Sequence, residues 1–266
     1  MLLHDFLSLL LYSFLFGCHF YHGGVNARII INQTGIQYYG QALVLWGKNM
    51  ALEIIPAVLV KTKEELLEHI SRVRNYVKTI HIDIMDNKFV PNFTIGVKEL
   101  QELPSGLKYE IHWMVQKPEE WIAKVKGPYL HMVHVEAVES WDNLAKAVKG
   151  SGGRLGVALN PETSLEKLKP HLKNAEKILV MSVHPGFYGQ KYIPDVEAKI
   201  RELRRMLPKA EIEVDGGINP ETGLRAAGAG ANGLAAASAI FARPDVGKAI
   251  EELKNSLKKG WGEWHG

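Results

Sequence analysis

The chain has almost no cysteine and no excess charge of either sign, and these two shortages exclude several classes of protein. Cys18 is the only cysteine among 266 residues, which rules out an intramolecular disulfide and any zinc site built from cysteine ligands. The 32 Lys and Arg are interleaved with 29 Asp and Glu, so the formal charge is only +3. This balance leaves no electrostatic footprint for nucleic acid. We therefore expect no nucleic-acid partner, and a reducing, cytoplasmic location for the main domain.

The first 49 residues lack the positive charge that normally precedes the apolar centre of a secretory signal. Their apolar run "FLSLLLYSFLFGCHF" is about 15 residues long, and Asp5 is the only formally charged residue between Leu2 and Ala27. The run is also short for a membrane span. Met50 opens "MALEIIPAVLV" and is the favoured true start, with a signal or anchor and a structured extension as alternatives. We expect residues 1–49 to be dispensable for the main domain.

No glycine-rich dinucleotide fingerprint follows the first strand-like run, which weakens a doubly wound sheet as an alternative fold. The apolar or alternating runs that predict strands are 52–60, 78–85, 108–115, 130–137, 154–160, 177–183, 211–218 and 232–241. The patterns that predict helices are 62–77, 118–125, 140–150, 164–172, 194–207, 219–228 and 243–257, with Thr62 and Asn219 at N-cap positions. Eight strands alternating with helices predict an α/β fold, a closed (β/α)₈ TIM barrel over residues 50–259. Residues 1–49 form a non-barrel N-terminal extension, and 260–266 form a tail.

Polar side chains occur near the ends of three predicted strands. In "HIDIMD" the side chains at alternate positions share one face, so His81 and Asp83 point the same way. His112 lies near the end of the third strand and Asp215 ends the seventh, and a barrel brings these ends to one mouth. A lone histidine on a strand is more often a core residue. Two histidines and two aspartates at one rim instead favour one divalent metal ion, such as Fe²⁺, Zn²⁺, Mn²⁺ or Co²⁺.

The two aspartates have a second interpretation, because paired acid/base groups can remove a proton from one face of a carbon and return one to the other. Asp83 and Asp215 are far enough apart around the rim to flank a substrate. A metal ion would then stabilise the oxyanion that forms when a proton leaves the carbon beside a carbonyl. Spacing alone supports metal-assisted proton transfer only weakly.

Three loops rich in small residues follow the last three predicted strands and predict a phosphate site. They are "HPGFYGQKYIP", "DGGI" and "AAASAIF", with Gly186, Gly189, Gly216, Gly217 and Ser238 as the residues expected to offer N–H groups. Loops near the seventh and eighth strands are where TIM barrels hold phosphate. The alternative is that these glycines are only turn residues.

With these residues in view, the chain from about Leu52 to Leu257 resembles the ribulose-phosphate 3-epimerases. The motifs "HIDIMDNKFVPN", "EIHWMV", "HVEA", "GVALNP", "VMSVHPGFYGQKYIP", "VDGGI" and "SAIF" fall in the order and spacing of that family. The resemblance implies that the metal ligands are His81, Asp83, His112 and Asp215. It also implies that Asp83 and Asp215 are the paired catalytic acid/base groups.

The resemblance further implies a substrate, a phosphorylated ketose. The expected reaction interconverts D-ribulose 5-phosphate and D-xylulose 5-phosphate through a 2,3-enediolate. Methionines crowd the reacting carbon in that family, and Met85, Met114 and Met181 occupy the matching positions, although their spacing alone would make them core residues. We expect no membrane association of the barrel, while a homo-oligomer remains open.

Five positions depart from the family pattern: Ala57 replaces a serine, Asn87, Tyr188 and Ala237 each replace a glycine, and Trp113 replaces a smaller aliphatic residue. Tyr188 and Ala237 fall in the expected phosphate site, so the resemblance specifies the type of reaction more closely than the identity of the sugar. The alternatives are a ketohexose 6-phosphate 3-epimerase and a non-catalytic phosphosugar-binding barrel. A barrel lyase or decarboxylase would usually have a lysine beside the strand-end carboxylate, and "HIDIMD" contains none.

Overall fold

The computed structural model describes residues 19–22, 25–32, 35–39 and 52–265. The described residues up to 39 belong to one compact unit and residues 52–264 to a second. In the first unit, β1 (His19–His22), β2 (Val25–Asn32) and β3 (Gly35–Tyr39) form an antiparallel sheet in that order. Most of the apolar run that the sequence analysis singled out lies outside the described residues. Its interpretation as an upstream translation, a signal or an extension therefore stays a prediction.

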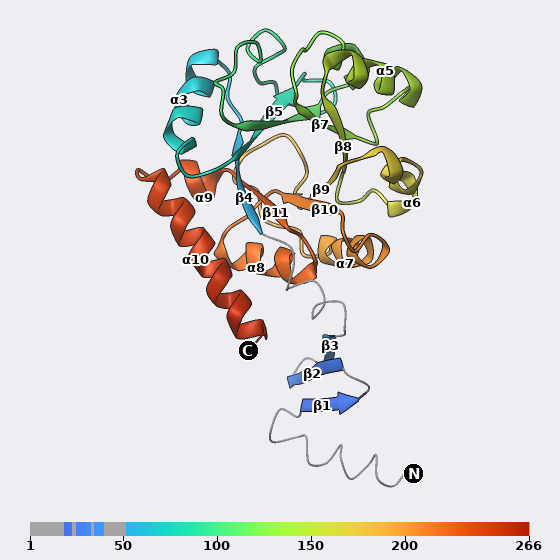
Figure 1. Ribbon diagram of the computed structural model, residues 1–266, viewed down its shortest axis with the longest axis vertical. Helices are drawn as coiled ribbons and strands as arrows, with labels where there is room; N and C mark the ends of the chain where they lie inside the picture. The colour runs from blue at the N-terminus through green and yellow to red at the C-terminus, as the bar shows by residue number, and fades with distance from the viewer. Residues whose placement is uncertain (1–18, 23–24, 33–34, 40–51, 266) are drawn as a thin grey trace. The chain divides into compact units, whose positions relative to one another are not determined.

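The second unit contains a closed barrel of eight parallel strands, in the order β10-β11-β4-β5-β6-β7-β8-β9 (Figure 1). The strands are β4 (Glu53–Val58), β5 (Thr79–Met85), β6 (Lys108–Met114), β7 (Leu130–His134), β8 (Arg154–Leu159), β9 (Lys177–Met181), β10 (Glu211–Asp215) and β11 (Gly233–Ala236). Closure confirms the predicted TIM barrel and excludes the doubly wound sheet, whose edges would stay open.

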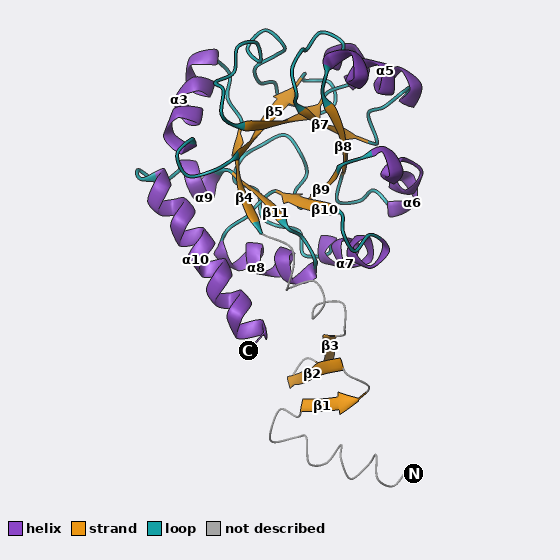
Figure 2. Ribbon diagram, viewed as in Figure 1, coloured by secondary structure: helices purple, strands orange, loops and turns teal. Residues whose placement is uncertain are grey.

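Helices surround the barrel on its outer side (Figure 2). They are α3 (Lys63–Val73), α4 (Pro118–Ile122), α5 (Trp141–Ser151), α6 (Leu165–Leu168), the 3₁₀ helix η1 (Lys169–Asn174), α7 (Val196–Met206), α8 (Pro220–Ala229), α9 (Ser238–Phe241) and α10 (Val246–His265). The predicted caps are confirmed, because Thr62 accepts a hydrogen bond from the N–H of Glu65 and Asn219 forms a capping box with Thr222. Among the described residues, 86–107 connect β5 to β6 without a helix. No helix in the described part of the chain has both the length and the hydrophobicity that a membrane crossing requires.

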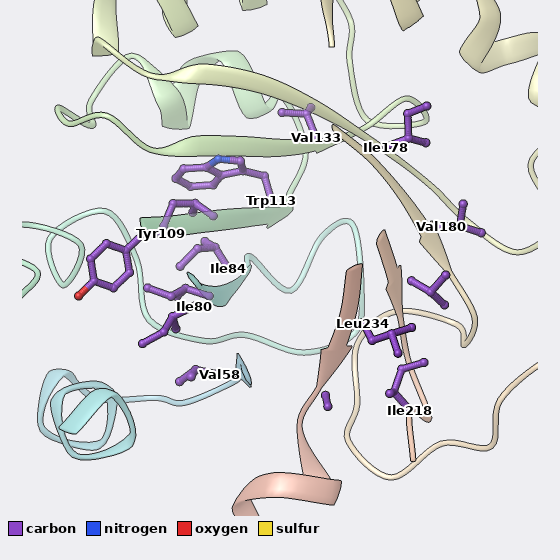
Figure 3. Packing of buried hydrophobic residues seen from close by; sticks show 14 of the residues in the cluster. Val58, Ile80, Ile84, Tyr109, Trp113, Val133, Ile178, Val180, Ile218 and Leu234 are labelled. Atoms are coloured by element: carbon purple, nitrogen blue, oxygen red, sulfur yellow. The ribbon is translucent and has the colours of Figure 1, made fainter. Parts of the chain in front are cut away.

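The alternation along β5 divides the strand between two environments. Ile80, Ile82 and Ile84 are fully buried in the large apolar core that also contains buried residues of the surrounding helices. Figure 3 shows Ile80 and Ile84 in this core. Burying each such side chain contributes about 1.5–3 kcal/mol. His81 and Asp83 are also buried, but they lie outside that core, on the face that points into the barrel. Burial of the apolar face stabilises the strand, so its inner face can present polar side chains to the barrel interior.

Candidate active site and metal centre

Four polar side chains meet at the C-terminal ends of the barrel strands. His81 and Asp83 come from β5, His112 from β6 and Asp215 from β10, and each has one ligand atom within 4.8 Å of those of the others. Asp83 Oδ1 lies 3.3 Å from His81 Nε2 and 2.9 Å from His112 Nδ1. Asp215 Oδ2 lies 3.8 Å from the same Nδ1 atom. Pairing between β5 and β6 sets Asp83 directly beside His112, so the parallel register creates half of this cluster.

The donor set suits a divalent transition metal ion. Buried His81 Nε2 makes no hydrogen bond, although it faces the cluster, and a buried polar atom without a partner carries a free-energy cost. The pocket above the cluster has neither Lys nor Arg among its described lining residues. Two aspartates therefore share a buried site in which no such side chain supplies positive charge. A divalent ion ligated by two imidazoles and two carboxylates would satisfy both the charge and the orphaned nitrogen.

The surroundings push the pKa values of the two aspartates in opposite directions. Burial raises the pKa of Asp215, and the negative charge of Asp83 raises it further. Burial also opposes ionisation of Asp83, but His112 and His81 outweigh it and hold the pKa of Asp83 below its ordinary value. Burial lowers the pKa of His112 to about 4, which favours the neutral imidazole that a metal needs. The cluster can thus hold one ionised and one protonated carboxyl group.

A single pocket brings together every residue that the sequence analysis predicted to bind substrate. Its lining contains Met85, Met114, Met181, Gly186, Gly189, Gly216, Gly217 and Ser238. Asp83 and Asp215 also reach this pocket, whereas His81 and His112 are absent from its lining and are fully buried. The two aspartates are therefore the cluster members that a molecule in the pocket would meet. Their catalytic roles stay predictions.

The backbone conformation of the turn after β10, in the predicted phosphate site, requires glycine at two positions. Gly216 has φ 117° and Gly217 has φ 62°, in the region that disfavours side chains. A Cβ on Gly217 would also come within 2.7 Å of the backbone nitrogen of Tyr192. These glycines are turn residues, as the alternative interpretation held, but the turn they form lines the pocket and begins close to Asp215.

The five departures from the family pattern have different structural consequences. Asn87 has φ 57°, a left-handed conformation that asparagine tolerates better than most residues, so it can stand where a glycine is usual. Trp113 faces away from the pocket, fully buried in the outer core, where its Nε1 donates a hydrogen bond to His131 Nδ1 (Figure 3). By contrast, Ala57, Tyr188 and Ala237 all line the pocket.

Tyr188 connects two loops at the mouth of the barrel. Its hydroxyl oxygen accepts a hydrogen bond from the backbone N–H of Leu59, just beyond β4, at 2.6 Å. The same β9–α7 loop is held a second time, because Asn92 Nδ2 donates to the carbonyl of Gly186 at 2.7 Å. Burial raises the pKa of the Tyr188 phenol, so the hydroxyl stays neutral across the physiological range.

Sequence reasoning missed a second polar cluster inside the barrel. The Lys177 ammonium makes an ion pair with Glu110 and lies 2.9 Å from Glu213 Oε2, and all three side chains are buried. Lys177 begins its strand-like run and carries no local signal of burial. The sequence analysis also assigned no role to His134 of the motif "HVEA", whose Nε2 atom lies 2.8 Å from His112 Nε2. The presence of this motif among the family motifs could have indicated such a role.

The comparison with known proteins identifies the family of the chain. The "Ribulose-phosphate 3 epimerase family" profile matches residues 53–241. The cytoplasmic isoform of ribulose-phosphate 3-epimerase from Oryza sativa subsp. japonica is 37% identical over 217 residues, covering 78% of this chain and 95% of the relative. The chain belongs to the ribulose-phosphate 3-epimerase family. Within that family, the ribulose-phosphate 3-epimerase of Bacillus subtilis (strain 168) is 36% identical, covering 77% of this chain and 99% of its own. The family resemblance found in the sequence is thereby confirmed.

Solved structures with low sequence identity to this chain share the fold. KGPDC from Streptococcus mutans superimposes with a TM-score of 0.60 at 14% identity, covering 80% of this chain and 100% of its own. The 3-hexulose-6-phosphate synthase from Salmonella typhimurium has a TM-score of 0.58 at 18% identity, covering 79% of this chain and 100% of its own. At such identities the likeness concerns the TIM barrel alone.

Proposed function

We propose that the chain is a metal-dependent ribulose-phosphate 3-epimerase that interconverts D-ribulose 5-phosphate and D-xylulose 5-phosphate. One observation carries the proposal: two histidines and two aspartates from three strands converge within 4.8 Å, and the aspartates line the pocket beside them. Membership of the family supports the same reaction. A reducing, cytoplasmic location remains our prediction.

Inversion at C3 needs one group to remove a proton and another to return a proton to the opposite face. Asp83 and Asp215 suit these roles, because both line the pocket from different strands, and in the metal-free cluster their surroundings shift their pKa values in opposite directions. The ionised carboxylate removes the C3 proton, the substrate becomes a 2,3-enediolate, and the protonated carboxyl group returns a proton from the other side. The roles exchange in the reverse reaction.

A divalent ion held by His81, Asp83, His112 and Asp215 would supply electrostatic stabilisation for the developing oxyanion. The identity of the ion is open among Fe²⁺, Zn²⁺, Mn²⁺ and Co²⁺, because the mixed imidazole and carboxylate set suits each of them. The methionines in the pocket, Met85, Met114 and Met181, would exclude water from the reacting carbon. Each is at most 3% exposed, so they form an apolar wall beside the two carboxyl groups.

The phosphate group of the substrate would bind at the loops after β9 and β10 and at the start of α9. This end of the pocket has no basic side chain among its described lining residues, so backbone N–H groups around Gly186, Gly189, Gly216, Gly217 and Ser238 would have to hold the phosphate. Uncharged N–H groups can bind a phosphate through short hydrogen bonds. The expectation is therefore a modest phosphate affinity that depends on loop geometry rather than on net charge.

A ketohexose 6-phosphate is the alternative substrate, and the presence of Ala57, Tyr188 and Ala237 in the lining is the observation that keeps it in view. A decarboxylase is less well supported. The buried lysine inside the barrel, Lys177, begins β9 at the opposite end of the strand and bonds to Glu110 and Glu213 rather than to Asp83.

The deciding experiment follows D-ribulose 5-phosphate by NMR in D₂O with purified protein of known metal content. Formation of D-xylulose 5-phosphate carrying deuterium at C3 supports the proposal. A higher kcat/KM for a ketohexose 6-phosphate would favour the alternative substrate. Binding of either sugar without exchange at C3 would identify a non-catalytic barrel.

A further inference from the structure

His81 contacts both polar clusters of the barrel interior, the candidate metal ligands on one side and the group of Lys177, Glu110 and Glu213 on the other. Its Nε2 atom faces Asp83 and makes no hydrogen bond, whereas its Nδ1 atom lies 3.0 Å from Glu213 Oε1. Glu213 is completely buried and lies two residues before Asp215 on β10. Because a carboxylate only accepts hydrogen bonds, this contact places the ring proton on Nδ1. The lone pair of Nε2 is then directed toward the candidate metal position.

Lys177 holds Glu213 in the orientation that this contact requires. Its ammonium lies 2.9 Å from Glu213 Oε2 and pairs with Glu110 on the other side. The two oxygens of Glu213 therefore have separate partners, His81 at one and Lys177 at the other. With both oxygens engaged, the carboxylate cannot rotate without losing a buried ion pair.

His112 is held in a similar way from a different strand. Its Nδ1 atom faces Asp83 and Asp215, while its Nε2 atom lies 2.8 Å from Nε2 of His134. The two rings stack with centroids 5.0 Å apart. On its far side, His134 Nδ1 lies 3.4 Å from Glu136 Oε2, and both atoms are buried without a hydrogen-bond partner. A proton on His134 Nδ1 leaves its Nε2 as an acceptor for His112, which in turn frees His112 Nδ1.

We propose that Glu213 and His134 are positioning residues for the metal centre, each fixing which ring nitrogen of a histidine ligand faces the ion. This inference rests on the proposed function, since it requires the cluster of His81, Asp83, His112 and Asp215 to hold a metal. Outer partners of this kind fix the tautomer and orientation of ligating histidines, and losing one typically weakens metal binding by about 10–100-fold. Neither residue lines the pocket, so neither is expected to contact the sugar.

The test measures Co²⁺ affinity, by competition with a chelator, for the full chain and for two variants, Glu213→Gln and His134→Phe. In Glu213→Gln, an amide cannot accept from both His81 and Lys177, so one of the two contacts is lost. In His134→Phe, the stacked ring remains but the acceptor for His112 is removed. We expect the Kd for Co²⁺ to rise by about 10–100-fold in each variant, with a changed visible spectrum of the bound ion. Saturating Co²⁺ should restore most of kcat and leave KM within about twofold.

His131→Gln is the matched control. His131 is another fully buried histidine of β7, but it bonds to Trp113 and Ser151 on the outer side of the barrel. It should lose stability without losing Co²⁺ affinity, which separates positioning from general damage. Equal Co²⁺ affinity and an unchanged spectrum in either folded variant would overturn the inference for that residue. If the parent chain itself binds no Co²⁺, the proposed function fails, and the inference fails with it.

Discussion

The barrel interior holds two acidic pairs, Glu110 with Glu213 near the middle of the strands and Asp83 with Asp215 at the mouth. The first pair is compensated from within the chain, because Lys177 bonds to both carboxylates and because burial and the negative charge of Glu213 raise the pKa of Glu110 to about 7. The second pair faces a pocket whose described lining contains no Lys or Arg. A lysine side chain occupies its carboxylate partners and leaves no position for another ligand, whereas a bound metal ion can keep coordination positions open for substrate. Strand β10 thus carries an internally paired carboxylate, Glu213, and a pocket-facing one, Asp215, two residues apart.

Removing one carboxylate at the mouth should have the largest effect. We expect Asp83→Asn and Asp215→Asn each to lower kcat by about 10²–10⁴-fold, because each aspartate would be both ligand and proton carrier. Steady-state assays with D-ribulose 5-phosphate, with metal content measured on the same samples, would check this. Asp195→Asn, at an exposed position before α7, is the control and should be unaffected. Near-normal turnover in either site variant would remove the two-aspartate scheme.

Removing the internal cation should damage stability. In Lys177→Met, Glu110 and Glu213 are left buried and uncompensated, and we expect the free energy of unfolding in urea to fall by about 3–5 kcal/mol. Adding Glu110→Gln should recover part of this loss, since one of the two facing charges is removed. A loss below about 1 kcal/mol for the single variant would mean that the inner pair does not depend on Lys177.

His131 is a third buried polar group, and it lies on the outer side of the barrel without any carboxylate partner among the hydrogen bonds described. Burial lowers the pKa of His131 to about 4, against 6.5 for an ordinary histidine. The unfolded chain therefore takes up a proton between these values while the folded chain does not, so stability falls as the pH drops from 6.5 to 4. The expected contribution is roughly 3 kcal/mol, from about 1.4 kcal/mol per pH unit.

Urea unfolding of the parent and of His131→Gln at several pH values would measure that contribution. The variant should be less stable at pH 7, but its stability should fall less steeply between pH 6.5 and 4. Parallel curves for the two proteins would show that His131 is not the group responsible.

The smallest effect is expected at the loop contact of Tyr188. Tyr188→Phe removes the hydrogen bond to the N–H of Leu59, and we expect KM to rise by less than about tenfold with kcat unchanged, as for the loss of one ordinary hydrogen bond. Tyr188→Gly should leave the preference for ribulose 5-phosphate over ketohexose 6-phosphates unchanged. A reversal of that preference would show that this loop sets the length of the sugar.

The fold was predictable because its signals are local. Strand alternation, helix periodicity and the caps at Thr62 and Asn219 each depend on residues within a few positions of one another. The short connections between strands and helices then left few topologies other than a barrel. The β5–β6 connection departs from the strict alternation that the sequence predicted, because the structure describes no helix between 86 and 107.

The candidate site was only partly predictable. The family motifs pointed to His81, Asp83, His112 and Asp215, which the structure brings together. Trp113 shows how sequence adjacency misleads, since it is flanked by His112 and Met114 yet faces the opposite side of the strand. Period-two alternation could have identified that, because neighbouring residues of a strand face opposite ways.

Which residues of a strand share a face can be read from the sequence, because the side-chain period of a strand is a property of the local backbone. What each face contacts depends on how the strands are arranged in the folded barrel. Lys177 reaches Glu110 and Glu213 across separations of 67 and 36 residues, and Tyr188 reaches Leu59 across 129. Such contacts exist because closing the barrel turns the inner faces of eight strands toward one another and gathers the loops that follow them at one mouth, and nothing in the local spacing of a lysine or a tyrosine encodes which residue lies opposite.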